Sequence, residues 1–365
     1  TWGERLSGTR CGRREASESA WARPGADEPV AAIDLGTNNC RLLIARPTQD
    51  GFRVIDAFSR IVRLGEGLNA DGRLSEAAMR RCLDALRICA EKLRRHRVRH
   101  LRAVATEACR RAANGGAFLA RVRRETGLDL EVIDQEAEAR LALAGCAPLL
   151  QPEVPNALIF DIGGGSTEVI WLREVPDAPG RMGLSAWYSL PVGVVGLSET
   201  YRGRNVDAAT YEAMIADVRA PLTAFVARSA VAGAADGGAM QMIGTSGTVT
   251  TLAGVYQNLP RYDRRRVDGC YLSFETIWTV SRRIAGMSEA ERLRNPCIGT
   301  QRADLVVAGC AILEAICRTW PVGRLRVADR GLREGMLLQM LGRARPEDFE
   351  DLTAPPETET EPETA

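Results

Sequence analysis

The sequence predicts an α/β protein of two lobes with a ligand cleft between them, and three observations support this prediction. The chain has 365 residues, more than one hydrophobic core commonly organises. The segments VAAIDLGTNNCRLLIAR (30–46) and ALIFDIGGGSTEVIWLR (157–173) share one plan, in which an apolar strand ends in Asp, a glycine-containing polar turn follows and a second apolar strand begins. Elsewhere, strand-like and helix-like segments alternate. The repeat indicates a duplicated domain, whose two turns would face each other across the cleft.

Periodicity and turn residues place the remaining elements in order. In the first lobe, the sequence predicts helices over 75–96, 115–127 and 136–147 and strands over 100–106 and 130–134, with Gly127 ending the second helix. In the second lobe, it predicts a helix over 207–227, a strand, polar turn and helix start over 239–255, a helix over 305–320, a strand over 324–329 and a closing helix over 331–341. In the first lobe, this alternation predicts a mixed sheet covered by helices.

We expect domain I at residues 29–148 and domain II at residues 149–329. The two ends of the chain, 1–28 and 346–365, show no apolar periodicity. The first end mixes Arg, Glu, Ser, Gly and Pro, and the second contains the acidic, proline-rich run TAPPETETEPETA. Such compositions bury too little apolar surface to offset the entropy of ordering, so both ends are predicted to be disordered tails.

Composition and charge exclude several classes of protein. The formal net charge is +1, no apolar run reaches the length of a membrane span, and the basic run KLRRHRVRH (92–100) contains no aromatic residues. We therefore expect neither a membrane nor a nucleic-acid partner. The polar N-terminal stretch has no apolar core typical of a secretory signal, and none of the ten cysteines forms a Cys-x-x-Cys pair, which indicates reduced thiols and a cytoplasmic location.

The scarcity of His and Lys limits the chemistry further. His96 and His100 are the only histidines, so a histidine-built metal hydrolase is not expected. Lys92 is the only lysine, and it does not stand in a GxxxxGK[ST] phosphate loop. Phosphate chemistry in this chain would have to use glycine-rich backbone, arginines, hydroxyls and carboxylates.

Six motifs occur in an order that resembles a known family. They are AAIDLGTNNCRLLI, VATEACRRAANG, EAEARLALAGC, IFDIGGGSTEVI, GTSGTVTTLAGV and ADRGLREGML, spread over about residues 30–342. Together they resemble the exopolyphosphatase/guanosine pentaphosphate phosphatase (Ppx/GppA) family. The resemblance implies the two-lobed actin-like ATPase fold of actin, sugar kinases and Hsp70. It also implies the short two-domain form, a C-terminal helix at about 330–345 that returns to domain I, a Mg²⁺ cofactor and a homodimer.

The glycine-rich turns are candidates for phosphate binding. Exposed amide N–H groups in such a turn form an anion-binding nest, which a side chain would obstruct. The resemblance assigns this role to Gly163, Gly164, Gly165 and Ser166 in the second lobe and to Gly36, Thr37 and Asn38 in the first. The family has Ser-Asn-Ser where this chain has TNN (37–39), and Thr37 keeps the hydroxyl. The competing interpretation is a glycine run that only permits a tight hairpin.

Asp161 and Asp34 end the strands that lead into these turns, and they are candidate metal ligands. A carboxylate beside a phosphate repels it unless a cation lies between them, and Mg²⁺ binds one or two carboxylates together with water and substrate phosphate. Asp161 is the first candidate and Asp34 the second. Either Asp could instead cap its own turn.

A carboxylate is expected to activate the attacking water, because no histidine lies near these motifs. The family carries its Glu in a Glu-Glu-Ala-Arg stretch, which here reads QEAEAR (135–140), with Ala137 in place of the first Glu. We assign the base to Glu138. Glu136 lies two positions away on a helix and points to the opposite side. Glu168 is the second catalytic candidate, as a metal-linked or water-orienting group.

Two further segments are candidates for phosphate contact. Arg110 matches a phosphate-binding Arg of the family, and a guanidinium can bind two phosphate oxygens, although a surface charge is the competing interpretation. The turn GTSGT (244–248) supplies a glycine- and hydroxyl-rich helix start, with Gly244, Ser246, Gly247 and Thr248 as candidates. Its competing interpretation is an N-cap.

The resemblance implies a hydrolase that removes the terminal phosphate of inorganic polyphosphate or the 5′ γ-phosphate of guanosine pentaphosphate. The sequence leaves the choice between these substrates open, because both end in the same phosphoanhydride. Two alternatives from other classes also stay open. One is a kinase of the same superfold, and the other is a protein that binds guanosine tetra- or pentaphosphate or polyphosphate with little turnover.

Overall fold

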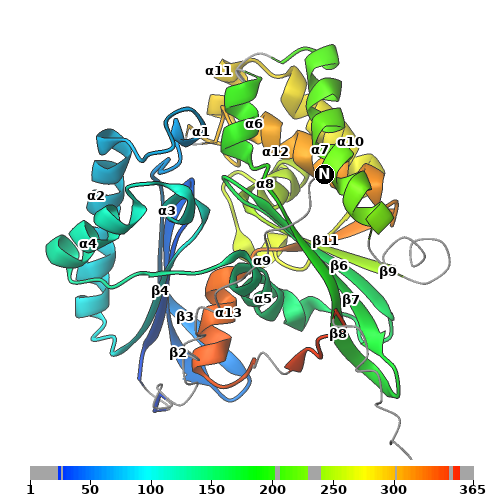
Figure 1. Cartoon of the computed structure of the whole chain (residues 1–365). Helices are drawn as coiled ribbons and strands as arrows, with labels where there is room; N and C mark the ends of the chain where they lie inside the picture. The colour runs from blue at the N-terminus through cyan, green and yellow to red at the C-terminus, as the bar shows by residue number, and fades with distance from the viewer. Residues whose placement is uncertain are drawn as a thin grey trace, which may run out of the picture.

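The computed structural model describes residues 24–25, 28–201, 206–228, 240–300, 302–344 and 348–353. The predicted tails, 1–28 and 346–365, lie outside these ranges except for residues 24–25, 28 and 348–353. The described chain forms two lobes, each built on one sheet, with helices between and around the sheets (Figure 1).

The first sheet has the strand order β3-β2-β1-β4-β5. Its strands are β1 (Val30–Leu35), β2 (Asn39–Thr48), β3 (Gly51–Ile61), β4 (His100–Ala105) and β5 (Glu131–Val132). Its helices are α1 (Leu68–Asp71), α2 (Glu76–Arg95), α3 (Glu107–Arg111), α4 (Gly115–Thr126) and α5 (Gln135–Cys146), followed by a 3-10 turn at Ala147–Leu149. One face of α2 is buried, including Ala78, Cys82, Leu86 and Cys89, and Gly127 ends α4 in the left-handed conformation, as predicted.

The second sheet has the order β10-β11-β9-β6-β7-β8. Its strands are β6 (Asn156–Ile162), β7 (Thr167–Val175), β8 (Ala178–Leu190), β9 (Met240–Thr245), β10 (Tyr271–Ser273) and β11 (Arg324–Ala328). The helices of this half are α6 (Val194–Thr200), α7 (Ala208–Arg228), α8 (Gly247–Tyr256), α9 (Arg264–Val267), α10 (Phe274–Gly286), α11 (Glu289–Arg294), α12 (Val306–Thr319) and α13 (Leu332–Met340).

The two sheets share one topology. In the first, β1, β2 and β3 form an antiparallel meander, and β4 and β5 add in parallel on the other side of β1. In the second, β6, β7 and β8 form the same meander, β9 and β11 add in parallel, and β10 is an additional edge strand. The duplication predicted from the two hairpins is therefore confirmed, since strand order and direction repeat as well as the sequence plan.

Two helices exchange sides between the lobes. The helix α5 follows the last strand of the first sheet, yet its buried Ala142 and Leu143 pack among residues of the second sheet. The helix α13 follows β11 of the second sheet, yet Met336 and Leu337 pack on β1, β2 and β4 of the first. The two helices lie side by side between the sheets (Figure 1).

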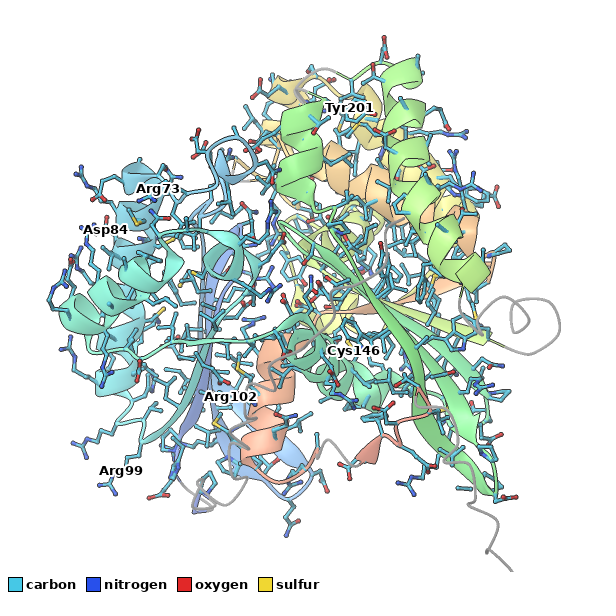
Figure 2. All side chains as sticks on the ribbon, in the orientation of Figure 1. Arg73, Asp84, Arg99, Arg102, Cys146 and Tyr201 are labelled. Atoms are coloured by element: carbon cyan, nitrogen blue, oxygen red, sulfur yellow. The ribbon has the colours of Figure 1, made fainter. Side chains whose placement is uncertain are left out.

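Glycines allow α5 and α13 to approach this closely. A Cβ on Gly145 would lie 2.0 Å from the carbonyl oxygen of Gly331, and a Cβ on Gly335 would lie 2.0 Å from that of Leu141. Figure 2 shows the neighbouring Cys146 near the centre of the molecule, whereas Arg73, Asp84 and Arg99 lie at the outside of the first lobe. The C-terminal part of α5 thereby meets the N-terminal part of α13.

Residues 348–353 run along β8 in the second lobe. Asp351 forms a parallel bridge with Leu184 and an ion pair with Arg140 of α5, with 2.8 Å between the charged atoms. This part of the predicted C-terminal tail is thus attached to the folded chain. No helix among the described ranges is both long and apolar enough to cross a membrane.

Candidate active site

A cleft of about 720 Å³ opens between the lobes, where the two hairpin turns meet. Its walls come from the turn after β1, the turn after β6, the first turn of α5, the start of α8, the loop before α12, and the residues between β11 and α13. All the residues proposed from the sequence line this cleft except Arg110 and Gly244. Segments far apart in the chain therefore form one site.

The two turns have the same backbone geometry. The N–H of Gly36 donates to the carbonyl of Asn39, and the N–H of Gly163 donates to that of Ser166, each with an N···O distance of 2.9 Å. Within the described ranges, the amides of Gly164 and Gly165 have no protein acceptor. These donors are free to bind an anion, as a nest requires.

The glycine run also allows the two turns to touch. A Cβ on Gly164 would lie 2.9 Å from the backbone nitrogen of Asn38, closer than real Cβ atoms approach. A Cβ on Gly165 would lie 2.9 Å from the Thr37 hydroxyl oxygen and 2.1 Å from Oε2 of Glu107. The two interpretations of the glycines are therefore compatible, because the missing side chains both free the amides and bring the lobes together.

The four acidic side chains proposed from the sequence face this cleft from the two lobes. Asp34 and Asp161 come from equivalent strand ends, Glu138 from the first turn of α5 and Glu168 from the start of β7. Burial is the largest cause of a raised pKa in all four. The pKa of Asp161 rises to about 7, with the charge of Glu168 as the second cause. A cluster of this kind, in a cleft, is typical of a functional site.

Glu138 is held where the sequence predicted it. The side chain of Asp134 caps α5 by accepting from the N–H of Ala137 at 2.8 Å, which fixes the first turn. Burial, and then the charge of Glu168, raise the pKa of Glu138 well above its usual value, while Arg110 opposes the rise. Glu136 is half exposed and pairs with Arg140, in agreement with its predicted outward direction.

Arg110 contacts Glu138 and lies outside the cleft lining. Its guanidinium donates to the carbonyl of Ile133 at 2.7 Å and lies 3.4 Å from Oε2 of Glu138. It does not line the cleft. Arg110 thus contacts Glu138 in this structure, and its contact with phosphate stays a prediction.

Glu168 is anchored by two hydroxyls. Ser166 donates to its Oε1 at 2.6 Å, and Ser189 of β8 donates to the same oxygen at 3.1 Å. These bonds lower the pKa of Glu168, but burial outweighs them and the pKa stays raised. The side chain is only 2% exposed, so it is fixed in place beside Asp161, its partner across the hairpin.

The start of α8 fits both interpretations of its sequence, an N-cap and a wall of the cleft. The hydroxyl oxygen of Ser246 accepts from the N–H groups of Thr248 and Val249 at 3.1 and 3.0 Å, which is an N-cap. Ser246, Gly247 and Thr248 also line the cleft. Gly244 does not, and a Cβ there would lie 2.5 Å from the ring of Phe160. Gly244 thus serves the packing of β9 against β6, and we leave it out of the proposed phosphate site.

Sequence reasoning missed the arginines of the cleft. Arg41, Arg264, Arg302, Arg330 and Arg333 all line it. Arg302 donates to the carbonyl of Gly247 and the hydroxyl of Thr251, and neither it nor Arg41 forms an ion pair among the described residues. Uncompensated guanidinium groups attract phosphate. In an arginine-rich sequence, only their burial and direction in the fold distinguish them from surface charges.

Glu107 was also missed. Its side chain is almost fully buried at the seam between the two turns, where Oε1 pairs with Arg111 at 2.9 Å and Oε2 has no hydrogen-bond partner. It lines the main cleft and also a smaller cavity of about 210 Å³ on the other side of the seam. Its charge contributes to the raised pKa of Glu168.

The acidic side chains fit a divalent cation of the magnesium type. Within the described ranges, Asp34 and Asp161 have no hydrogen-bond donor or ion-pair partner. Burial and neighbouring carboxylates raise the pKa of both, so a cation would stabilise their ionised forms. The described chain holds no cluster of three or more His, Cys, Asp or Glu that could enclose a metal. Mg²⁺ needs no such enclosure, because it keeps several waters and uses few carboxylates.

Comparisons with known proteins agree with this geometry. The Ppx/GppA phosphatase family matches residues 43–344. Exopolyphosphatase 2 of Mycobacterium tuberculosis is 30% identical over 330 residues, which cover 86% of this chain and 98% of that protein. The guanosine-5′-triphosphate,3′-diphosphate pyrophosphatase of Photobacterium profundum is 30% identical over 326 residues, which cover 88% of this chain but only 61% of that longer protein.

Solved structures give the same result. The Ppx/GppA family member from Aquifex aeolicus has a TM-score of 0.69 at 30% identity, and the match covers 87% of this chain and 99% of that one. An exopolyphosphatase from Cytophaga hutchinsonii has a TM-score of 0.75 at 26% identity over 87% of this chain and 99% of that one. The predicted two-lobed α/β fold and the predicted family are both confirmed, and the chain belongs to the Ppx/GppA phosphatase family.

Proposed function

We propose that this protein hydrolyses the terminal phosphoanhydride bond of inorganic polyphosphate, of guanosine pentaphosphate, or of both. The observation that carries the proposal is the position of Glu138, a carboxylate with only 14% of its side chain exposed and a raised pKa, in the cleft that also holds the free amides of Gly164 and Gly165. Relatives over most of the chain are named exopolyphosphatase and guanosine pentaphosphate pyrophosphatase, which supports the same reaction.

Glu138 is the proposed general base. Water attacks the terminal phosphorus, the bond to the bridging oxygen breaks, and Glu138 accepts the proton that the water loses. A carboxylate with a raised pKa is a stronger base than an ordinary Glu, and Arg110 limits the rise in Glu138. The products are orthophosphate and a substrate one phosphate shorter.

Backbone amides and arginines supply the charge stabilisation. The free N–H groups of Gly164 and Gly165 would donate to the terminal phosphate, with the hydroxyl of Thr37 beside them. Arg41 and Arg302 would bind oxygens of the phosphates that follow. Because these groups are fixed by the fold, they need little reorganisation when charge develops in the transition state.

Asp161, with Asp34 as the second ligand, would hold Mg²⁺ or another divalent cation. The cation would neutralise the phosphate oxygens next to the carboxylates. Glu168, anchored by Ser166 and Ser189, would accept a hydrogen bond from the attacking water or from a water bound to the cation. The raised pKa of Asp161 is consistent with a carboxylate that needs a cation beside it.

The proposal is tested by measuring orthophosphate release from long-chain polyphosphate and from guanosine pentaphosphate, each with MgCl₂ and with EDTA. We expect release from at least one substrate and its loss in EDTA. Phosphoryl transfer from ATP to an organic acceptor, with no release from either substrate, would instead identify a kinase. Tight binding of guanosine tetraphosphate without release would identify a binding protein.

The compartment is inferred from the cysteines, and the oligomeric state from the family resemblance. The nine cysteines in the described ranges are all free, which fits a reducing compartment, so we infer that the protein acts in the cytoplasm. The homodimer implied by the family resemblance stays a prediction, which sedimentation of the purified chain would test.

A further inference from the structure

The strand order of the second sheet sets a direction along the cleft. Asp161 of β6 pairs with Thr245 of β9, and Thr245 pairs in turn with Ala328 of β11. Asp329 directly follows Ala328. Neighbouring strands lie about 4.8 Å apart, so Asp329 lies roughly 10 Å across the sheet edge from Asp161. A substrate with its terminal phosphate at Asp161 can therefore extend over β9 towards the end of β11.

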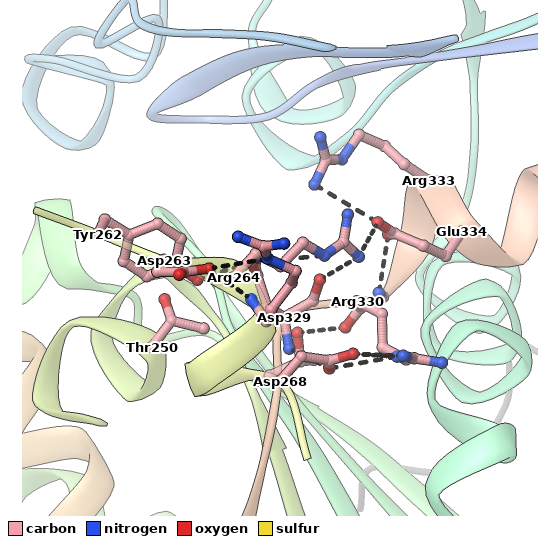
Figure 3. Close-up of polar contacts among 12 residues, drawn as sticks. Thr250, Tyr262, Asp263, Arg264, Asp268, Asp329, Arg330, Arg333 and Glu334 are labelled. Carbon is pink, nitrogen blue, oxygen red and sulfur yellow. Dashed lines mark hydrogen bonds and ion pairs between the residues drawn. The ribbon is translucent and has the colours of Figure 1, made fainter. Parts of the chain in front are cut away.

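An aromatic side chain lies at that far end. The hydroxyl of Tyr262 donates to Oδ2 of Asp329 at 2.6 Å, and Thr250 also bonds to this hydroxyl. Tyr262 lines the cleft and is 39% exposed, although its hydroxyl is held. Figure 3 shows the ring at one end of a polar network that continues through Asp329 and Arg264 to Glu334.

This network makes the ring a rigid surface. Arg264 donates to the carbonyl of Asp329 at 2.5 Å and to Oε1 of Glu334 at 2.9 Å. Glu334 in turn accepts from the N–H of Gly331 at 3.0 Å at the start of α13. A tyrosine fixed through its hydroxyl presents its ring face without a further loss of side-chain entropy when a ligand binds.

The part of the cleft near Tyr262 has fewer carboxylates than the part at the hairpin turns. Cys297, Ile298 and Thr300 also line the cleft, and Arg302 and Arg264 are cations near Tyr262 and its partner Asp329. Most of the carboxylates lie at the other end, around Asp161. Polyphosphate is charged along its whole length and has no apolar face to place against an aromatic ring. A nucleobase has such a face, and bases stack on aromatic side chains whatever their sequence.

We infer that Tyr262 is a specificity-determining residue, on which the base of a nucleoside polyphosphate stacks while its terminal phosphate lies at Asp161 and Glu138. This inference deepens the proposed function and rests on it for the direction of the substrate. Tyr262 contributes to the binding of the nucleoside substrate and contributes nothing specific to polyphosphate.

The test compares two substrates on the same protein samples. Wild type, Tyr262→Ala, Tyr262→Phe and Tyr256→Ala are assayed for kcat/KM with guanosine pentaphosphate and with long-chain polyphosphate. Tyr256 is a matched control, because it is 49% exposed and does not line the cleft. Tyr262→Phe removes the hydrogen bond to Asp329 but keeps the ring, so it separates stacking from support of the network.

We expect Tyr262→Ala to lower kcat/KM for guanosine pentaphosphate by about 5- to 150-fold, the range that base–aromatic stacking supplies. Its value for polyphosphate should stay within about twofold of wild type. Tyr262→Phe should keep most of the preference, and Tyr256→Ala should keep all of it. Equal losses for both substrates in Tyr262→Ala, or a loss as large in Tyr262→Phe, would overturn the inference.

If the proposed hydrolase activity is absent, the phosphate-release assay gives a different result. In that case wild type releases no phosphate from either substrate. Equilibrium binding of guanosine tetraphosphate to wild type and to Tyr262→Ala then tests the ring alone. Weaker binding by the variant would support the stacking role, and equal binding would remove it.

Discussion

Arg41 and Glu168 occupy equivalent positions in the two hairpins. Arg41 lies directly across from Asp34 in the pairing of β1 with β2, and Glu168 lies directly across from Asp161 in the pairing of β6 with β7. The first lobe thus places a cation beside its aspartate, whereas the second places another carboxylate there. Arg41 lowers the pKa of both aspartates, and Glu168 raises that of Asp161. The duplicated hairpin has become electrostatically asymmetric, so the second lobe is the stronger candidate to bind a cation.

The first prediction concerns the stability of the metal-free protein. Burial raises the pKa of Asp161 to about 7 in the folded state, against about 3.9 for an unfolded chain. The folded state therefore retains a proton that the unfolded state loses, and the contribution of Asp161 to stability falls as pH rises from about 4 to about 7. An Asn at this position cannot titrate. In EDTA, the difference in Tm between Asp161→Asn and wild type should therefore grow in favour of the variant as pH rises from about 4 to about 7. Above about pH 7 this difference should stay constant.

Adding MgCl₂ at pH 8 completes this test. A cation that binds only the folded wild type raises its Tm by mass action. The increase should be smaller in Asp161→Asn, because a ligand is lost. Parallel Tm curves for the two proteins across pH, together with equal responses to MgCl₂, would show that Asp161 is neither strained nor a cation ligand.

The second prediction concerns the seam between the lobes. Gly164→Ala places a Cβ 2.9 Å from the backbone nitrogen of Asn38, which cannot move without moving its hairpin. The two turns should separate, and a misplacement of about 1 Å in such a site can cost about 100-fold in rate. We expect orthophosphate release to fall by at least tenfold.

Gly116→Ala is the control for that substitution. Gly116 lies in the first turn of α4, and a Cβ there meets nothing within 4 Å. Alanine favours the helix by up to about 1 kcal/mol over glycine, so activity should persist and stability should hold or rise. Normal activity in Gly164→Ala would mean that contact between the turns does not matter for catalysis.

The third prediction separates the two roles of Ser246. Removing its hydroxyl in Ser246→Ala leaves the N–H groups of Thr248 and Val249 without their cap, which costs about 1 kcal/mol of unfolding free energy. Ser273→Ala removes a similar cap from α10, outside the cleft. Urea unfolding should show comparable losses in both variants, and only Ser246→Ala should also raise KM. An unchanged KM in Ser246→Ala would leave the N-cap as its only role.

The fourth prediction concerns the crossing of α5 and α13. Gly145→Ala would bring a Cβ within 2.0 Å of the carbonyl oxygen of Gly331. The helices would have to separate, and repacking of this kind commonly costs 1–3 kcal/mol. We expect a lower urea midpoint together with reduced activity, because Glu138 lies on α5. A midpoint equal to that of wild type would show that the crossing is loose.

The sequence predicted the parts of the site that local patterns define. The two hairpins, the aspartates at the ends of their first strands and the proposed base Glu138 each lie in a motif that can be recognised without the fold. The third strands of the two meanders were not predicted. One is β3, which is partly exposed over most of its length, and the other is β8, which carries Pro179, Gly180 and Gly183. Proline and glycine lower the strand propensity of β8, whereas β3 was missed although it contains Phe52, Val54 and Ile55.

The residues that the sequence did not reveal depend on contacts between distant segments. Glu107 resembles an ordinary acid in the first turn of a helix until the seam between the turns buries it. Tyr262 lies in a loop, and its hydroxyl finds its partners on other segments, Asp329 after β11 and Thr250 of α8. Arg110 was predicted to bind phosphate, but the fold places it beside Glu138. In each case the role is set by neighbours that are far away in sequence.

The central claim is that Glu138 activates water in this cleft, and one pair of variants tests it most directly. Orthophosphate release is measured for wild type, Glu138→Gln and Glu136→Gln with the preferred substrate and MgCl₂. Glu136 is the matched control, because it lies on the same helix turn, is half exposed and pairs with Arg140. We predict that Glu138→Gln lowers kcat by about 10²- to 10⁴-fold, the contribution of a general base, and that Glu136→Gln stays close to wild type. A Glu138→Gln protein that releases phosphate at the wild-type rate would contradict the account.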